Sequence, residues 1–145
     1  MKKLVIVIVS VFNFQIYAQE APIYHNGKEH LNRNPPYSEA VSMDNTIYVS
    51  GQVGLTKEGE LIKGGIEQET KLSLTRIKNI LEKYGSSMDR VVKCTCILSD
   101  IKDFKKMSAI YRTFFPKDRL PARTTFAGQV AIGAKIEIDC IAKIN

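Results

Sequence analysis

The chain of 145 residues contains no tryptophan, only two histidines and only three cysteines. Proteins that bind nucleic acid without sequence preference combine a basic groove with stacking aromatic side chains. Here the lysines are scattered singly or in pairs. The formal net charge of +6 falls to +4 if Lys2 and Lys3 leave with an N-terminal signal, because 21 basic residues become 19 against 15 acidic ones. This mild basic excess is typical of a solvated surface, so we expect no nucleic acid partner.

The scarcity of histidine and cysteine excludes two kinds of site. His25 and His30 precede the predicted folded core, so a Ser-His-Asp triad has no well-placed base. With these histidines, Cys94, Cys96 and Cys140 form no zinc-ligand pattern. The segments "GQVG" and "KGG" also lack the spacing and the Lys-Ser/Thr ending of a phosphate-binding loop. The sequence therefore contains neither a zinc motif nor a nucleotide loop.

The three cysteines are interpreted as buried and inert. Cys94 and Cys96 are two positions apart in a predicted strand, so they point to the same face but are poorly angled for a disulfide with each other. The odd number leaves at least one thiol free.

Residues 1–18 are predicted to be an export signal. Two lysines precede an unbroken apolar run over residues 4–9, which continues patchily to Ala18 before a polar start. The run is shorter than the ~20 apolar residues of a membrane span, and the alternative, a buried N-terminal strand, fits the charged start poorly. No cysteine near the junction offers a lipid anchor. We expect an exported, periplasmic protein with no stable membrane anchor after signal cleavage.

The rest of the chain is predicted to form an arm and one domain. Residues 19–34 are polar and irregular and end in "NRNPP", which is typical of an extended N-terminal arm. Residues 35–145 are enough for a single domain with a hydrophobic core. The composition, 44% hydrophobic and 25% charged, is that of an ordinary globular protein.

The pattern becomes regular from Tyr37. "AVSMDNTIYVSG" has two β-rich pieces around Asp44 and Asn45, which predicts a hairpin. A second turn is expected at residues 57–60, where Gly59 can take a positive φ. Further on, "RVVKCTCILSD" alternates closely enough to predict a half-buried strand.

Two helices are predicted from apolar residues that recur every three to four positions. The first spans about residues 66–84 and is closed by Gly85, a C-cap candidate. The second spans about residues 101–115 and is ended by Pro116. Its aromatic and methionine stripe is interpreted as packing between helix and sheet. The stripe consists of Phe104, Met107, Tyr111 and Phe114 or Phe115.

Two terminal strands, "RTTFAG" and "KIEIDCIAKI", complete the pattern. Strands, helix, strand, helix and two more strands predict an α+β domain with both helices on one face of a single mixed sheet. The other face carries Thr, Cys and Ile as well as charge and has no helix of its own. We therefore expect self-association that covers this face.

Arg123 and Glu137 are the candidates for chemistry. Arg123 begins one terminal strand and Glu137 lies in the other, so a hairpin between these strands would bring the two side chains close enough to share a pocket. An arginine binds a carboxylate through a bidentate fork, and a nearby glutamate can accept a proton from water. The alternative is a structural ion pair between the two, and spacing alone does not decide.

The domain contains, in order, "PYSEAV", "IYVSGQVGL", "SSMDRVVKCTCILSDIKDF", "YRTFF", "LPARTTF" and "KIEIDCIA". Over about residues 35–143 these segments resemble the RidA family of reactive intermediate (enamine/imine) deaminases, also called the endoribonuclease L-PSP family. The resemblance implies a chorismate-mutase-like α+β fold that forms a homotrimer with a central barrel and active sites at subunit interfaces. It also implies hydrolytic deamination of 2-imino or enamine acids to 2-oxo acids and ammonia, with no metal or organic cofactor.

The resemblance also assigns roles to residues of this sequence. It makes Arg123 the clamp for the substrate carboxylate and Glu137 the residue that positions the attacking water. Tyr37 would line the pocket, and the backbone at Gly51 would approach the ligand where a side chain could not fit. The Thr125 hydroxyl would hydrogen-bond the substrate.

Three features depart from the family pattern. Ser108 stands where an asparagine is expected, and the segment 127–135 is shorter and lacks a Leu-Pro pair, which affects the placement of Glu137. The export signal is the third, because typical family members work in the cytosol. The alternative function is therefore a non-catalytic trimeric small-carboxylate binding protein of the periplasm. No acid and base pair is placed for RNA cleavage, so ribonuclease activity is not expected.

Overall fold

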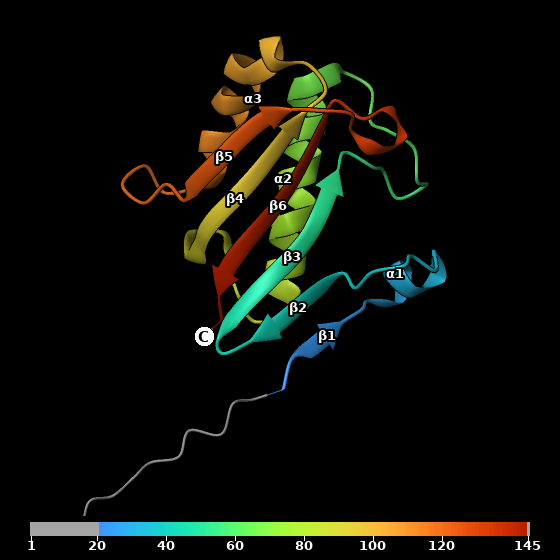
Figure 1. Cartoon of the computed structure of the whole chain (residues 1–145), viewed down its shortest axis with the longest axis vertical. Coiled ribbons are helices and arrows are strands. Elements are labelled where there is room, and N and C mark those ends of the chain that lie inside the picture. Colours follow the sequence, from blue (N-terminus) through green and yellow to red (C-terminus); the bar gives the residue numbers. More distant parts are fainter. Residues whose placement is uncertain (1–20, 145) are drawn as a thin grey trace, which may run out of the picture.

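The computed structural model describes residues 21–144, which form one mixed sheet backed by helices (Figure 1). The six strands lie in the order β1-β2-β3-β6-β4-β5, and every neighbouring pair is antiparallel except β4 with β5. The strands are β1 (Ile23–His25), β2 (Ala40–Met43), β3 (Thr46–Val53), β4 (Val91–Leu98), β5 (Ala122–Ala127) and β6 (Ile136–Lys143). The helices are α1 (Lys28–Asn32), α2 (Gly65–Lys83) and α3 (Phe104–Tyr111).

The hydrophobic core lies between the sheet and the pair α2 and α3, which cover the same face (Figure 1). On α2, Leu74, Ile77 and Leu81 are fully buried against β3 and β6. Burying a side chain of this size stabilises the fold by about 1.5–3 kcal/mol relative to leaving it exposed. On β6, alternate residues from Ile136 onward are buried, so its other face is left for polar side chains. The predicted α+β fold, with two helices on one face of a mixed sheet, is confirmed.

The hairpin of β2 and β3 turns at Asp44 and Asn45, as predicted. Both residues have positive φ, 49° and 57°, and the pair Met43 and Thr46 closes the turn. Two successive left-handed residues give the type of two-residue turn that matches the twist of antiparallel strands. Short polar side chains tolerate this conformation better than others do.

The two predicted helices are present, and the second is shorter than expected. α2 ends at Lys83, after which Gly85 takes a φ of 83° and the Ser86 amide donates to the Leu81 carbonyl at 2.8 Å. This is the glycine-closed end that the sequence predicts. The predicted helix 101–115 is α-helical only over α3, because the single turns before and after it are 3-10 helices.

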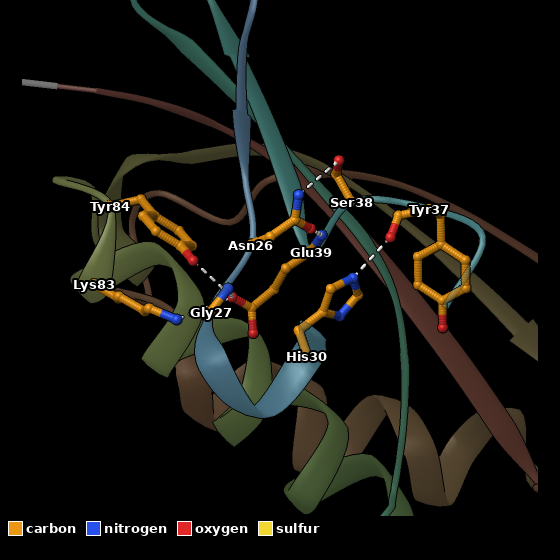
Figure 2. Close-up of polar contacts among 8 residues, drawn as sticks. All are labelled: Asn26, Gly27, His30, Tyr37, Ser38, Glu39, Lys83 and Tyr84. Carbon is orange, nitrogen blue, oxygen red and sulfur yellow. Dashed lines mark hydrogen bonds and ion pairs between the residues drawn. The ribbon is translucent and has the colours of Figure 1, made fainter. Parts of the chain in front are cut away.

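The described part of the predicted arm, residues 21–34, is more regular than an extended arm. From residue 21 it forms β1, which pairs with β2, and then α1. Glu39 holds this segment in place, since its Oε2 accepts hydrogen bonds from Tyr84 Oη at 2.7 Å and the Gly27 amide at 3.2 Å (Figure 2). Lys83 Nζ pairs with the same oxygen at 3.1 Å. The expectation of irregular structure was wrong because these contacts join residues that are far apart in the sequence, and local composition does not report such contacts.

The terminal strands β5 and β6 do not pair with each other as a hairpin. β6 lies between β3 and β4, and β5 pairs in parallel with β4 at the edge of the sheet. The alternate residues of β6 are buried, whereas much of β5 is exposed, so the more apolar strand takes the central position. A parallel neighbour needs a crossover connection, which α3 supplies between β4 and β5.

Two of the three cysteines are joined. Cys94 on β4 lies directly opposite Cys140 on β6, and the two form a disulfide. Cys96 is a buried free thiol, and burial raises its pKa to about 11, with the positive charge of Arg123 acting in the other direction. All three cysteines are buried, as the sequence predicted, and one thiol is free. The pairing of Cys94 with Cys140 was not predicted, because sequence spacing does not give the register between β4 and β6.

The predicted signal over residues 1–18 lies outside the described residues. Within residues 21–144, the structure contains no helix with the length and apolar character needed to cross a membrane.

Candidate functional site

Arg123 on β5 points toward α3 and lies on aromatic side chains. Its guanidinium carbon is 5.2 Å from the ring centroid of Phe104 and 4.7 Å from that of Tyr111. Nη2 donates to Ser108 Oγ at 3.1 Å, and Nη1 contacts Met107 Sδ at 3.8 Å. No carboxylate among residues 21–144 forms an ion pair with Arg123. The positive charge is thus held in a fixed orientation without being neutralised, which suits it to bind an anion.

Ser108 and Thr125 lie beside this arginine. Ser108 departs from the family pattern, yet its hydroxyl accepts a hydrogen bond from Arg123. Thr125 follows Arg123 by two residues on the same strand, so both side chains point to the same face. Its hydroxyl is buried and has no well-formed hydrogen bond among the described residues. We call Arg123, Ser108 and Thr125 the arginine cluster.

Glu137 and Gly51 form a second group on the opposite face of the sheet. Glu137 alternates with the buried Ile136 and Ile138, so its half-buried side chain points away from the helices. The pairing of β3 with β6 is irregular between Val49 and Gln52, at the point where Gly51 lies. A Cβ atom added at Gly51 would collide with the Glu137 carboxylate. The glycine is therefore needed for the carboxylate to lie over the backbone of β3, and we call these two residues the glutamate pair.

Within one chain, the arginine cluster and the glutamate pair do not meet. Arg123 is in register with Cys94 on β4, and Cys94 lies opposite Cys140, three residues beyond Glu137 on β6. One intervening strand and opposite faces of the sheet thus separate Arg123 from Glu137. Neither a shared pocket formed by a β5–β6 hairpin nor a structural ion pair between the two residues exists in the single chain.

Tyr37 lies apart from both groups, in the loop between α1 and β2. Its side chain is 57% exposed, so it is free to contact a ligand or another protein chain. The buried His30 fixes its backbone, because His30 Nε2 donates to the Tyr37 carbonyl oxygen at 2.7 Å (Figure 2). The two rings also pack edge to face with centroids 5.5 Å apart. His30 is thus a positioning residue for Tyr37.

Sequence reasoning missed how α3 serves the site. Phe104 and Tyr111 were interpreted as packing residues only, but both rings also contact the guanidinium of Arg123. Tyr111 is buried, and burial raises the pKa of its hydroxyl, so this side chain stays neutral beside the arginine. The available signal was a pair of aromatic residues about two turns apart on one helix, but to use it required knowing that β5 lies next to α3.

Residues 28–144 match the family described as Endoribonuclease L-PSP. The chain belongs to this family, which is also known as the RidA family. Two relatives carry the name 2-iminobutanoate/2-iminopropanoate deaminase. The protein from Mus musculus is 44% identical over 111 residues, which cover 74% of this chain and 80% of the relative. The protein from Homo sapiens is 42% identical over 111 residues, covering 74% and 79%.

Solved structures of RidA-family proteins have the same fold. RidA from an Antarctic Psychrobacter bacterium is 32% identical and superposes with a TM-score of 0.72, covering 76% of this chain and 89% of the other. Yeast Mmf1 is 29% identical and superposes with a TM-score of 0.72, covering 76% of this chain and 88% of the other. The family resemblance seen in the sequence is therefore confirmed at the level of fold.

Proposed function

We propose that this RidA-family protein hydrolyses reactive 2-imino and enamine acids to 2-oxo acids and ammonia. The observation that carries the proposal is Arg123, whose guanidinium is oriented by Ser108 and two aromatic rings but is not neutralised. A group of this kind binds a small carboxylate in one orientation. The names of the relatives from mouse and human supply the substrate class, 2-iminobutanoate and 2-iminopropanoate.

In the proposed reaction, the substrate carboxylate lies on Arg123, and the Thr125 hydroxyl provides a further hydrogen bond. Glu137 accepts a proton from a water molecule, and the water oxygen forms a bond to the electrophilic imine carbon. The proton passes on to the imine nitrogen, which gives an amino alcohol. The hydroxyl group of this intermediate loses its proton to the nitrogen as the carbon–nitrogen bond breaks, and the nitrogen leaves as ammonia. The carbon keeps the oxygen as the carbonyl of the 2-oxo acid, so the reaction consumes one water and no redox partner.

This reaction needs the arginine cluster and the glutamate pair in one place, and we propose that two copies of the chain provide it. The sheet face opposite the helices supports association, since it exposes large apolar side chains. These are Tyr48, Val92 and Phe126, which are 45%, 49% and 46% exposed. A homotrimer in which this face lines a central barrel would cover them. Each active site would then take Arg123 from one copy and Glu137 from the next.

The function is tested by generating 2-iminopropanoate and 2-iminobutanoate in situ with an amino-acid oxidase and following their loss. We expect the protein to accelerate the loss, and both Arg123→Ala and Glu137→Gln to abolish the acceleration. If Glu137→Gln left turnover intact, or if the protein gave no acceleration above buffer, the proposal would be wrong. Saturable binding of 2-oxo acids without turnover would instead identify a carboxylate-binding protein.

We also propose that the protein is exported to the periplasm. The charged and apolar start of the sequence supports this, as does the disulfide between Cys94 and Cys140, because disulfides persist in oxidising compartments and are rare in the cytosol. Fractionation of cells that express the full chain, with the mass of the recovered protein, tests the proposal. A cytosolic protein that retains residues 1–18 would contradict it.

A further inference from the structure

A cleft of about 560 Å³ lies on the helix side of the sheet, between α1, α2 and the loop that follows β3. This is a volume typical of sites for small ligands. None of the residues of the arginine cluster or the glutamate pair lines it. The cleft is therefore a separate feature of the chain, and the proposed deaminase reaction makes no use of it.

Arg76 of α2 is the cationic side chain held at the wall of the cleft. Its Nε donates to Gln52 Oε1 at 3.0 Å, and its Nη1 donates to the Leu55 carbonyl oxygen at 3.3 Å. Both acceptors are neutral, and no carboxylate among the described residues forms an ion pair with Arg76. Nη2 has no acceptor among these residues. The guanidinium is thus fixed by two hydrogen bonds and retains donors for a third partner.

A second arginine faces the same space. Arg33, at the end of α1, lines the cleft and is exposed. Burial lowers the pKa of Arg76, and the positive charge of Arg33 adds to this effect, whereas Glu39 and Glu29 act in the other direction. Two like charges directed at one cleft repel each other, and an anion placed between them would remove that repulsion.

The rest of the lining indicates which anion fits. Three glutamates and one lysine also line the cleft, so its formal charge is balanced and a polyanion would be repelled. Leu55, Leu72 and Ile80 provide an apolar part of the wall. A singly charged carboxylate with a hydrocarbon body matches both properties.

The contacts of Gln52 show that the cleft and the glutamate pair lie on opposite faces of the sheet. Gln52 is buried, and its side-chain amide donates to the Ser50 carbonyl oxygen at 3.0 Å. It pairs with Ile138, whose side chain faces the helices, whereas Glu137 faces the other way. A ligand on Arg76 is thus separated from Glu137 by the backbone of the sheet and cannot be a substrate in transit to it.

We propose that this cleft is a binding site for a small monocarboxylic acid with an apolar body, whose carboxylate is held by Arg76 and Arg33. The site is distinct from the one at Arg123 and does not depend on the deaminase proposal. The proposal assigns a ligand to the cleft between α1, α2 and the loop that follows β3.

The test uses sodium hexanoate as the probe, because it has a carboxylate and an apolar body but no imine or 2-oxo group. Titration of the purified protein, followed by calorimetry and by backbone amide shifts in NMR spectra, should show saturable binding with shifts at Gln52 and Leu55. Hexanamide, which has the same body without the charge, should not bind. Inorganic phosphate should bind more weakly than hexanoate. The proposal is wrong if hexanoate does not saturate, if it shifts only Thr124 and Thr125, or if phosphate binds better.

Variants separate the two arginine sites. Arg76→Gln should weaken hexanoate binding by about tenfold, the effect of losing charge-assisted hydrogen bonds, and Arg33→Gln by about threefold, since its charge is exposed. Arg123→Gln is the matched control and should leave the hexanoate-induced shifts at Gln52 and Leu55 unchanged, because Arg123 does not line this cleft. Because Arg33 is exposed, its replacement tests the site even if Arg76→Gln fails to fold. Binding that survives Arg33→Gln unchanged and is lost in Arg123→Gln would overturn the proposal.

Discussion

Arg123 and Glu137 point to opposite faces of the same sheet and come from strands that are separated by β4. Arg123 is turned toward α3, where it contacts Ser108, and Glu137 lies over Gly51 on the face without helices. A single chain thus holds two halves of the proposed active site, and the central claim is that neighbouring copies join them.

Replacing Gly51 by alanine should strongly reduce deaminase activity. The added Cβ would occupy the space of the Glu137 carboxylate, which would have to move. We expect a loss of stability of about 1–3 kcal/mol, as is usual for overpacking, and a larger loss of turnover than of binding. Turnover of 2-iminobutanoate and chemical denaturation measure the two effects. Gly128→Ala is the matched control for the loss of a glycine, since a Cβ at that position would meet only Ile97 Cγ2, at an ordinary contact distance of 3.7 Å. Wild-type activity in Gly51→Ala would contradict the assigned role of Glu137.

Ser108→Ala tests the orientation of the arginine. The change removes the acceptor of the Arg123 Nη2 hydrogen bond, which contributes on the order of 1 kcal/mol. We expect KM to rise about fivefold with little change in kcat, because the guanidinium remains on its aromatic rings. Ser108→Asn should restore KM, since an amide oxygen can accept the same bond. If Ser108→Ala lowered kcat and left KM unchanged, the serine would act in the chemical step rather than by orienting Arg123.

The stability that Glu39 contributes to the fold should be lost in acid. Burial opposes ionisation of this carboxyl, but hydrogen bonds from Tyr84 and Lys83 outweigh it, so the pKa lies below the ordinary value of 4.5. A group whose pKa is lower in the folded state stabilises the fold above its unfolded pKa, and this stability is lost as the pH falls through the folded pKa. Glu39→Gln should therefore cost about 2 kcal/mol at pH 7.

The pH dependence provides the check on Glu39. Thermal unfolding of wild type and Glu39→Gln should differ at pH 7, and the difference should shrink as the pH falls below 4.5. Glu82→Gln is the control, because Glu82 forms only an exposed ion pair with Lys78. A difference between the proteins that is independent of pH would show that Glu39 acts through packing instead of its charge.

The disulfide should be detectable by counting thiols. The unfolded, unreduced protein should expose one reactive thiol per chain, that of Cys96, and all three cysteines after reduction. The disulfide closes a sequence separation of 46 residues, so its reduction should lower the free energy of unfolding by about 3–4 kcal/mol. Denaturation with and without a reductant measures this change, and Cys96→Ala should respond to reduction as the wild type does. Three reactive thiols before reduction would contradict the disulfide.

Local patterns predicted much of the fold. Asp44 and Asn45 gave the hairpin because their short polar side chains tolerate a positive φ, and Gly85 gave the end of α2 for the same steric reason. The candidate residues Arg123 and Glu137 also stood out, because an arginine can bind a carboxylate through a bidentate fork and a glutamate can accept a proton from water.

The parts that sequence reasoning missed depend on which segments lie side by side. The insertion of β6 between β3 and β4 separates Arg123 from Glu137 and brings Cys94 opposite Cys140. Strand order is set by the whole core, and no pattern within β5 or β6 reports it. For the same reason Glu39, which ties the N-terminal segment to the end of α2, was not recognised.

The joining of the two halves is tested most directly by mixing two inactive variants. Arg123→Ala retains the glutamate pair, and Glu137→Gln retains the arginine cluster. The two proteins are unfolded together, refolded as a mixture and assayed with 2-iminobutanoate. In a cyclic trimer, random assembly gives about a quarter of the sites one intact half from each neighbour, so the account predicts about a quarter of wild-type activity.

The matched control mixes Arg123→Ala with the double variant Arg123→Ala/Glu137→Gln, which offers no intact arginine and should stay inactive. Recovery of activity only in the first mixture would show that each site takes Arg123 and Glu137 from different copies. A first mixture that remains inactive, although wild-type protein treated in the same way recovers its activity, would contradict the account.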